Sequence, residues 1–259
     1  MLVLVPVLVL LGLAVGSFLN VVVWRLPRGE SVVSPPSACP ACSSPIRSRD
    51  NVPVAGWLLL KGRCRDCAAS ISPRYPVVEA LTGGLFAVVA LHFGLDPVLP
   101  AYLFLVAVGL ALALIDVDIQ RLPDRLTLPS YPIFAALLGL GTLLGSGSGH
   151  LVRALLGGLA MYTFYRAIRS AYPPGMGMGD VKLSGVLGMA TAWLGWGAWG
   201  IGLFAGFLFG GVWGIGLIAL RRGGRKSKVP FGPFMLAGTL AGVLVGEPLA
   251  EAYLRLTVG

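Results

Sequence analysis

The chain has 259 residues, of which 56% are hydrophobic and only 12% carry a charge. A soluble domain has about 25% charged residues, so this composition excludes an ordinary water-soluble globular protein and indicates a surface that faces lipid. The net charge of +9 does not require nucleic acid, because the Lys and Arg residues cluster in short loops between apolar segments. We expect a lipid bilayer, and no nucleic acid, as a partner.

The first apolar segment, residues 1–24, is long enough to cross a bilayer, which takes about 20 apolar residues. It lacks the cationic start of a secretory signal peptide and is followed by Arg25 and Arg28. Because positive charges stay on the cytoplasmic side, this pattern predicts an outside N-terminus and a cytoplasmic segment after residue 24.

Residues 25–75 break the apolar pattern and are predicted to form a small cytoplasmic domain. All four cysteines lie here, in two C-x2-C pairs: Cys39, Cys42, Cys64 and Cys67. This spacing is typical of a closed, structural zinc site with four thiolates, whose metal would supply much of the folding energy of so small a module. Two disulfides are the first alternative, which a reducing cytoplasm disfavours. A redox C-x-x-C is the second, and no thioredoxin-like pattern supports it.

Residues 76–259 are predicted to form a seven-helix transmembrane catalytic domain. Its apolar runs cover residues 76–93, 99–116, 126–145, 151–170, 181–198, 199–220 and 231–257. The sequence therefore predicts an all-α polytopic membrane protein with about eight transmembrane helices. With eight spans, every Lys and Arg except Arg153 and Arg255 lies in a cytoplasmic loop, including the cationic run at 221–228, and both termini lie outside.

Four of the few acidic residues lie at the predicted cytoplasmic ends of these helices: Asp116, Asp118, Asp124 and Asp180. An ionisable residue at the edge of a bilayer is costly, so each is a candidate functional residue. Asp116 ends the third predicted span and Asp180 begins the sixth, at the same membrane face. Two carboxyl groups that share a proton can polarise a carbonyl and activate water, so this pattern fits a catalytic aspartyl pair, although paired membrane acids also serve transport.

Each aspartate also has a structural explanation. Asp180 precedes a helix, where an acid caps the first turn, and Asp118 and Asp124 are explained equally well as caps or loop charges. Asp116 is different, because the helix dipole disfavours an anion at a helix C-terminus. Gly177 and Gly179, just before Asp180, leave room for an extended substrate backbone.

Two further charged residues are candidate supporting groups. Glu79, in the first turns of the second span, could position substrate or pair with Arg74, and the helix dipole explains it about as well. Lys182 could hold substrate or tune the aspartates, and snorkelling to the membrane interface explains it equally well.

Six segments together resemble one family, the bacterial type IV prepilin peptidases, which are also N-methyltransferases. They are GSFLNVVVWRLPRG at 16–29, KGRCRDC at 61–67, ISPRYPVVEALTG at 71–83, IDVDIQRLPD at 115–124, GMGMGDVKL at 175–183 and VPFGPF at 229–234. The resemblance implies that Asp116 and Asp180 are the catalytic aspartates and that the four cysteines bind metal.

The same resemblance implies the activity. Such enzymes of the inner membrane cut the leader from type IV prepilins or pseudopilins after a Gly, at the cytoplasmic face. They then methylate the new N-terminal residue with S-adenosylmethionine, a cofactor for which the residues alone give no motif.

Two other classes of function are weighed against this one. A proton-coupled transporter also uses paired membrane carboxylates, but its site is expected near the midplane, often between repeated halves. A non-catalytic assembly protein with a zinc module would leave Asp116 without a reason.

Overall fold

The computed structural model describes residues 1–146, 148–220 and 229–257. Every regular element among these residues is a helix and none is a strand, so the all-α class is confirmed. The helices are α1 Leu4–Arg25, α2 Ala55–Leu59, α3 Arg74–Phe93, α4 Leu99–Ile119, α5 Asp124–Gly141, α6 Ser148–Ala171, α7 Met178–Leu194, α8 Trp196–Ala219 and α9 Gly232–Thr257. Four short helical turns join them: η1 Leu26–Arg28, η2 Ser48–Asp50, η3 Thr142–Ser146 and η4 Pro173–Gly175. The cationic run at 221–228 lies outside the described residues.

Six of the described helices are long and apolar enough to cross a membrane: α1, α3, α4, α5, α8 and α9. The other two predicted spans correspond to α6 and α7. α7 has only 17 residues, and α6 carries Arg153, Arg166 and Arg169. Six membrane-competent helices are therefore shown, and the figure of eight spans stays a prediction.

By its contacts the chain divides into two compact units, Met1–Leu95 and Asp96–Gly259. In the first unit α1 packs against α3. A Cβ atom at Gly12 would lie only 2.9 Å from the Cα of Gly83, so the small residues allow the two backbones to approach closely. This division reports packing alone, and the predicted functional domains 1–24, 25–75 and 76–259 stay a prediction.

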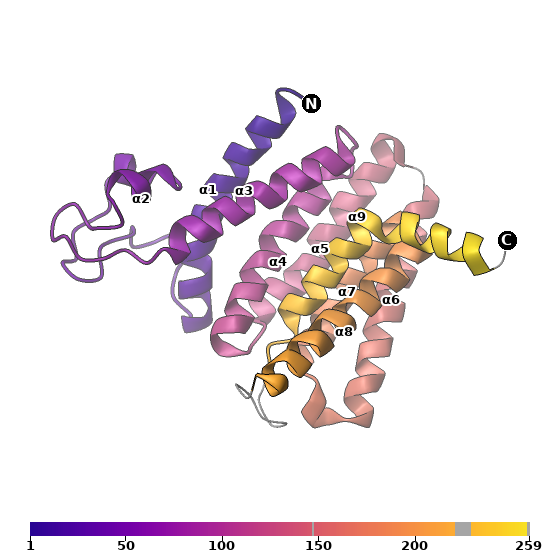
Figure 1. Cartoon of the computed structure of the whole chain (residues 1–259). Coiled ribbons are helices and arrows are strands. Elements are labelled where there is room, and N and C mark those ends of the chain that lie inside the picture. The colour runs from indigo at the N-terminus through magenta and orange to yellow at the C-terminus, as the bar shows by residue number, and fades with distance from the viewer. Residues whose placement is uncertain (147, 221–228, 258–259) are drawn as a thin grey trace. The chain divides into compact units, whose positions relative to one another are not determined.

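In the second unit α7 is the central helix. It contacts α5, α6, α8 and α9, and nearly all of its side chains from Val181 to Trp193 are buried. α8 and α9 run side by side (Figure 1) and touch through small residues four positions apart. For example, a Cβ atom at Gly242 of α9 would lie 2.6 Å from the carbonyl oxygen of Ala198 in α8. α7 thus faces protein on several sides, unlike a helix that spans lipid alone.

The break between α7 and α8 corrects one predicted boundary. The expected border was residues 198 and 199, whereas α7 ends at Leu194 and α8 begins at Trp196. Side chains from other helices hold this turn. Arg153 of α6 donates hydrogen bonds of 2.6 to 3.0 Å to the last three carbonyls of α7. Glu247 of α9 accepts the N–H of Ala198 at 2.9 Å, in the first turn of α8.

Candidate functional site

Asp116 lies in the last turn of α4, as the sequence predicted. Its side chain is buried, with 5% of the residue exposed. One carboxyl oxygen, Oδ2, accepts the backbone N–H of Gly232, at 3.0 Å. α4 stops three residues later because Gln120 takes a left-handed conformation with φ 53°. Since Gly232 is the first residue of α9, the carboxyl of Asp116 joins the end of one helix to the start of another.

Asp180 is the third residue of α7 and is also buried, with 8% exposed. Its Oδ2 accepts the backbone N–H of Gly177, at 3.1 Å. A carboxylate in the first turn is favoured by the free N–H groups and the dipole of the helix. Asp180 therefore does not precede the helix, although the sequence predicted that it would: α7 begins at Met178, Gly177 is the N-cap, and the Asp180 carboxyl reaches back from the first turn to the Gly177 N–H. This contact is compatible with a chemical role for the same carboxyl.

The structure brings Asp116 and Asp180 together. The segments that hold them meet around Leu122, in the turn between α4 and α5. A Cβ atom at Gly179 would lie 2.8 Å from the Leu122 side chain, and one at Gly232 would lie 3.6 Å from it. The two carboxyl groups also interact electrostatically. Because two neighbouring carboxylates repel each other, the arrangement is suited to one protonated and one ionised carboxyl.

The two aspartates are held in the same way. Each Oδ2 accepts a single backbone N–H from a glycine, at 3.0 Å for Asp116 and 3.1 Å for Asp180. A Cβ atom on either glycine, Gly232 or Gly177, would lie only 2.9 Å from that same oxygen. Both glycines therefore let the backbone approach a carboxyl more closely than a residue with a side chain would allow.

Lys182 and Asp124 form an ion pair at the edge of this site. Lys182 Nζ lies 2.8 Å from each carboxyl oxygen of Asp124, the first residue of α5. Their side chains are 26% and 55% exposed, so the pair contributes little stability by itself. It does tie the start of α5 to the first turns of α7, next to Asp180.

Glu79 lies in the first unit, on α3. It is buried, with 8% exposed, and its Oε2 accepts the backbone N–H of Val54 at 2.7 Å. Val54 has a φ of 60° and immediately precedes α2. Glu79 thus anchors the cysteine-containing segment to α3.

The four cysteines form a cluster that could hold a metal ion. All four sulfur atoms lie within 4.8 Å of one another, and Cys39 Sγ lies 3.8 Å from Cys67 Sγ. A tetrahedral zinc ion with Zn–S bonds of about 2.3 Å would space its sulfurs about 3.8 Å apart. The cysteines form no disulfide. Their separation therefore fits four thiolates on one ion.

The two cysteine pairs lie on two turns of the same shape. The N–H of Ser43 donates to the carbonyl of Cys39 at 2.8 Å, and the N–H of Ala68 donates to that of Cys64 at 2.9 Å. Ser43 and Ala68, each four residues after the first cysteine of its pair, have φ of 60° and 59°. Each turn thus presents two sulfurs toward the other turn.

Backbone groups in these turns favour thiolates. Hydrogen bonds from the Ser44 side chain and backbone lower the pKa of Cys42 to about 6. The backbone N–H of Cys67 lowers the pKa of Cys64. For Cys67 the Ala69 N–H acts in the same direction, but hydrogen bonds from Cys42 and the other thiols outweigh it and raise the pKa of Cys67 to about 12. A bound metal would displace that remaining proton.

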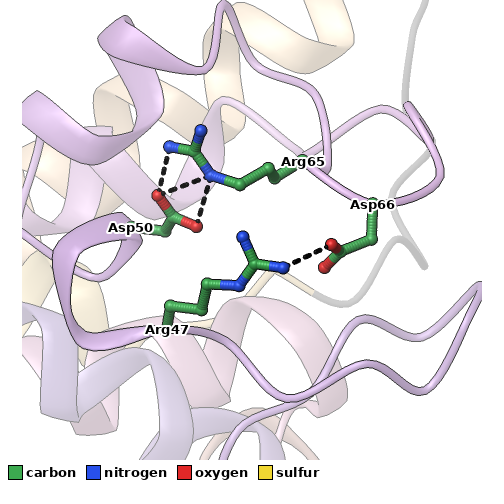
Figure 2. Close-up of polar contacts among 4 residues, drawn as sticks. All are labelled: Arg47, Asp50, Arg65 and Asp66. Carbon is green, nitrogen blue, oxygen red and sulfur yellow. Dashed lines mark hydrogen bonds and ion pairs between the residues drawn. The ribbon is translucent and has the colours of Figure 1, made fainter.

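Two ion pairs brace the second turn, as Figure 2 shows. Arg65 binds both carboxyl oxygens of Asp50, through Nε at 2.9 Å and Nη2 at 2.6 Å, and Arg47 lies 2.8 Å from Asp66. The hydrogen bond from Arg65 lowers the pKa of Asp50. The segment around η2 is thereby fixed to the loop that carries Cys64 and Cys67.

The fold and these two sites define an all-α membrane protein with a pair of buried aspartates and a cysteine cluster suited to metal. Residues 10–93 match the family model described as Bacterial Peptidase A24 N-terminal domain, and residues 103–215 match the Type IV leader peptidase family. The chain belongs to the type IV leader peptidase family.

Curated relatives agree with this assignment. The chain is 38% identical to the prepilin leader peptidase/N-methyltransferase of Aeromonas salmonicida (strain A449), over 95% of this chain and 92% of the relative. It is 36% identical to the protein of that name from Pseudomonas aeruginosa, with the same coverage, and 40% identical to that from Neisseria gonorrhoeae, over 74% of each chain. No solved structure matches the chain.

Three of the described residues near the aspartates were not predicted from the sequence. Gly232 binds Asp116, and Tyr165 and Arg169 of α6 contact the segments that hold the two carboxyl groups. Gly232 belongs to VPFGPF at 229–234, a motif that supported the family resemblance without any assigned chemistry. Its place between Pro230-Phe231 and Pro233-Phe234, after a cationic run of sequence, is the one signal that could have found it.

Proposed function

We propose that this protein is a membrane aspartyl endopeptidase that removes the leader from type IV prepilins or pseudopilins and then methylates the new N-terminus. The observation that carries the proposal is the pair of buried carboxyls, Asp116 and Asp180, each held by one glycine N–H at the end of a helix. Membership of the type IV leader peptidase family supports the same activity.

In this proposal the pair hydrolyses an amide. One carboxyl keeps its proton and donates a hydrogen bond to the oxygen of the scissile carbonyl. The other is ionised and accepts a proton from a water molecule, whose oxygen attacks the carbonyl carbon. The C–N bond then breaks as the leaving nitrogen takes up the proton that the second carboxyl accepted from water, which returns that carboxyl to its ionised form. Gly177 and Gly179, in the segment that leads into Asp180, are proposed to help position an extended substrate.

The position of the acids favours a peptidase over a proton-coupled transporter. Asp116 lies in the last turn of α4, and Asp180 lies in the first turn of α7. A leader joined to an apolar helix would present its cut site at such a membrane edge. We therefore place the site at the cytoplasmic face of the inner membrane, with both chain termini outside.

The cysteine cluster is proposed to bind one Zn²⁺ as a structural ion. Four sulfurs within 4.8 Å of one another leave no open position for substrate or water, unlike a catalytic zinc site. When bound, the ion supplies cross-links to a segment with few other constraints. Glu79 and the Asp50–Arg65 ion pair hold the same segment.

S-adenosylmethionine is proposed as the methyl donor because the relatives are named N-methyltransferases. It supplies an electrophilic methyl group to the amine that cleavage exposes. The cavity between α4, α5 and α7, lined in part by Leu105, Leu112 and Leu183, has a volume of about 10 Å³. This small apolar cavity does not fit the cofactor.

Purified protein incubated with a prepilin peptide tests the peptidase proposal. Asp116→Asn and Asp180→Asn should each abolish cleavage, as measured by mass spectrometry, while both variants still insert into membranes. Glu251→Gln is the matched control, because this carboxyl forms an exposed pair with Arg255 on α9. Full cleavage by either aspartate variant would show that the pair does not do the chemistry.

A further inference from the structure

Two residues of α6, Arg169 and Tyr165, lie one helical turn apart and contact the segments that hold the two aspartates. A spacing of four residues places both side chains on one face of a helix. Arg169 is half-buried and Tyr165 is buried, with 2% exposed. Neither belongs to the motifs that define the site, and both have specific partners there.

Arg169 acts on the peptide group that binds Asp180. Its Nη1 donates a hydrogen bond of 2.6 Å to the carbonyl oxygen of Met176. That carbonyl and the N–H of Gly177 belong to one planar peptide group. The same N–H donates to Asp180 Oδ2 at 3.1 Å. The guanidinium therefore fixes the far end of the group that orients Asp180, and its charge polarises the N–H to make it a stronger donor.

Tyr165 packs against Phe231, the residue before Gly232, whose N–H binds Asp116. Its ring stacks on Phe207 of α8, with centroids 5.5 Å apart and planes at 25°. Phe231 completes the cluster, with centroids 6.4 Å from Tyr165 and 5.3 Å from Phe207. The carbonyl of Phe231 and the N–H of Gly232 form one peptide group, and that N–H donates to Asp116. Packing of these rings therefore limits the movement of the Asp116 anchor.

We propose that Arg169 and Tyr165 are positioning residues for the aspartyl pair. Arg169 orients Asp180 through the Met176–Gly177 peptide, and Tyr165 orients Asp116 by packing against Phe231. One face of α6 thus sets the separation of two carboxyls that come from α4 and α7. The inference rests on the proposed peptidase function of those carboxyls.

The expected defects follow from geometry. A catalytic group misplaced by about 1 Å can cost on the order of 100-fold in rate. Arg169→Gln should therefore lower kcat by about 10-fold to 100-fold and leave KM within about twofold, because the loss affects the reacting groups rather than substrate binding. Arg169→Lys should recover most of the rate, since an ammonium can donate to the same carbonyl. Tyr165→Leu should lower kcat by about 10-fold, whereas Tyr165→Phe should stay near wild type because it keeps the ring.

Steady-state cleavage of a prepilin peptide tests the inference, with thermal unfolding measured for every variant. Arg166→Gln is the matched control, because it removes the same charge from an exposed position on the same helix. Low kcat, unchanged KM and near-normal unfolding for Arg169→Gln and Tyr165→Leu would support the inference. Wild-type kcat in either variant, or a rise in KM alone, would overturn it for that residue.

A second variant at each position tests the inference if the first variant does not fold. If Arg169→Gln does not fold, Arg169→Lys decides, because a folded Lys variant as inactive as Asp180→Asn would contradict the orienting role. If Tyr165→Leu does not fold, Tyr165→Phe decides, because a large loss there would mean that the ring is not the working part. Cleavage by Asp116→Asn would instead refute the proposed function, whereas inactive aspartate variants beside normal α6 variants would refute this inference alone.

Discussion

A single added carbon on the glycines that hold the aspartates should impair catalysis without unfolding the protein. In Gly232→Ala the new Cβ would lie 2.9 Å from Asp116 Oδ2, and in Gly177→Ala it would lie 2.9 Å from Asp180 Oδ2. Neither glycine has a positive φ, so alanine can adopt the backbone conformation at both positions. The substitution therefore tests the space beside the carboxyl and nothing else.

The size of the effect follows from these distances. Ordinary contact begins at 3.4 Å, so each carboxyl must move by about 0.5 Å or lose part of its N–H hydrogen bond. A displacement of about 1 Å can cost on the order of 100-fold. Half of that displacement should therefore lower kcat by about 10-fold, which corresponds to about 1.4 kcal/mol in the barrier. KM should change little, because substrate contacts away from the reacting atoms are kept.

The assay is steady-state cleavage of a prepilin peptide in detergent, with unfolding followed in parallel. Gly139→Ala in α5 is the matched control, because a Cβ there meets nothing within 4 Å, and it should cleave at the wild-type rate. Wild-type kcat in Gly232→Ala and Gly177→Ala, with Asp116→Asn inactive, would show that the glycine anchors do not set the geometry of the pair.

Three further changes test the metal cluster and the packing of the second unit. Cys64→Ser should reduce bound zinc from about one ion per chain to almost none, measured by elemental analysis; retained zinc would rule out the four-sulfur site. Gly242→Ala should lower the free energy of unfolding by about 1–3 kcal/mol because the new Cβ pushes α9 away from α8. Gly200→Ala is the control, because a Cβ at that position meets nothing within 4 Å. Equal shifts of the unfolding temperature in the two variants would contradict the close approach of the helices. Arg153→Met removes the donors to three carbonyls of α7 and should cost about 1.5–3 kcal/mol, and an unchanged unfolding temperature would dismiss that cap.

The helices could be predicted because an apolar run is a local property of the chain. The run at 99–116 corresponds to α4, Leu99–Ile119, and the run at 231–257 corresponds to α9, Gly232–Thr257. The border between α7 and α8 was wrong by a few residues for a physical reason. The groups that cap that turn, Arg153 and Glu247, come from α6 and α9. No window of sequence around residue 195 contains them.

The sequence predicted only those site residues whose own side chains supply the reactive or metal-binding group. Asp116 and Asp180 stand out because carboxylates are rare at helix ends in an apolar chain, and the cysteines stand out by spacing. The groups that orient the aspartates do not, because a backbone N–H is present at almost every residue. Gly232 gains its role from a contact with Asp116, which is far away in the chain, and Arg169 from a contact with Met176 across the turn between α6 and α7.

The number of hydrogen bonds on each aspartate suits a pair that must hold one proton between two carboxyls. Among the described residues, Asp116 and Asp180 each accept one backbone N–H. Two or three such bonds would fix a carboxyl as the anion, and neither could then donate to a substrate carbonyl. No bond at all would leave a buried carboxyl without a defined orientation. One N–H on each Oδ2 fixes the position of both groups. The bound substrate and water then determine which carboxyl is protonated and which is ionised.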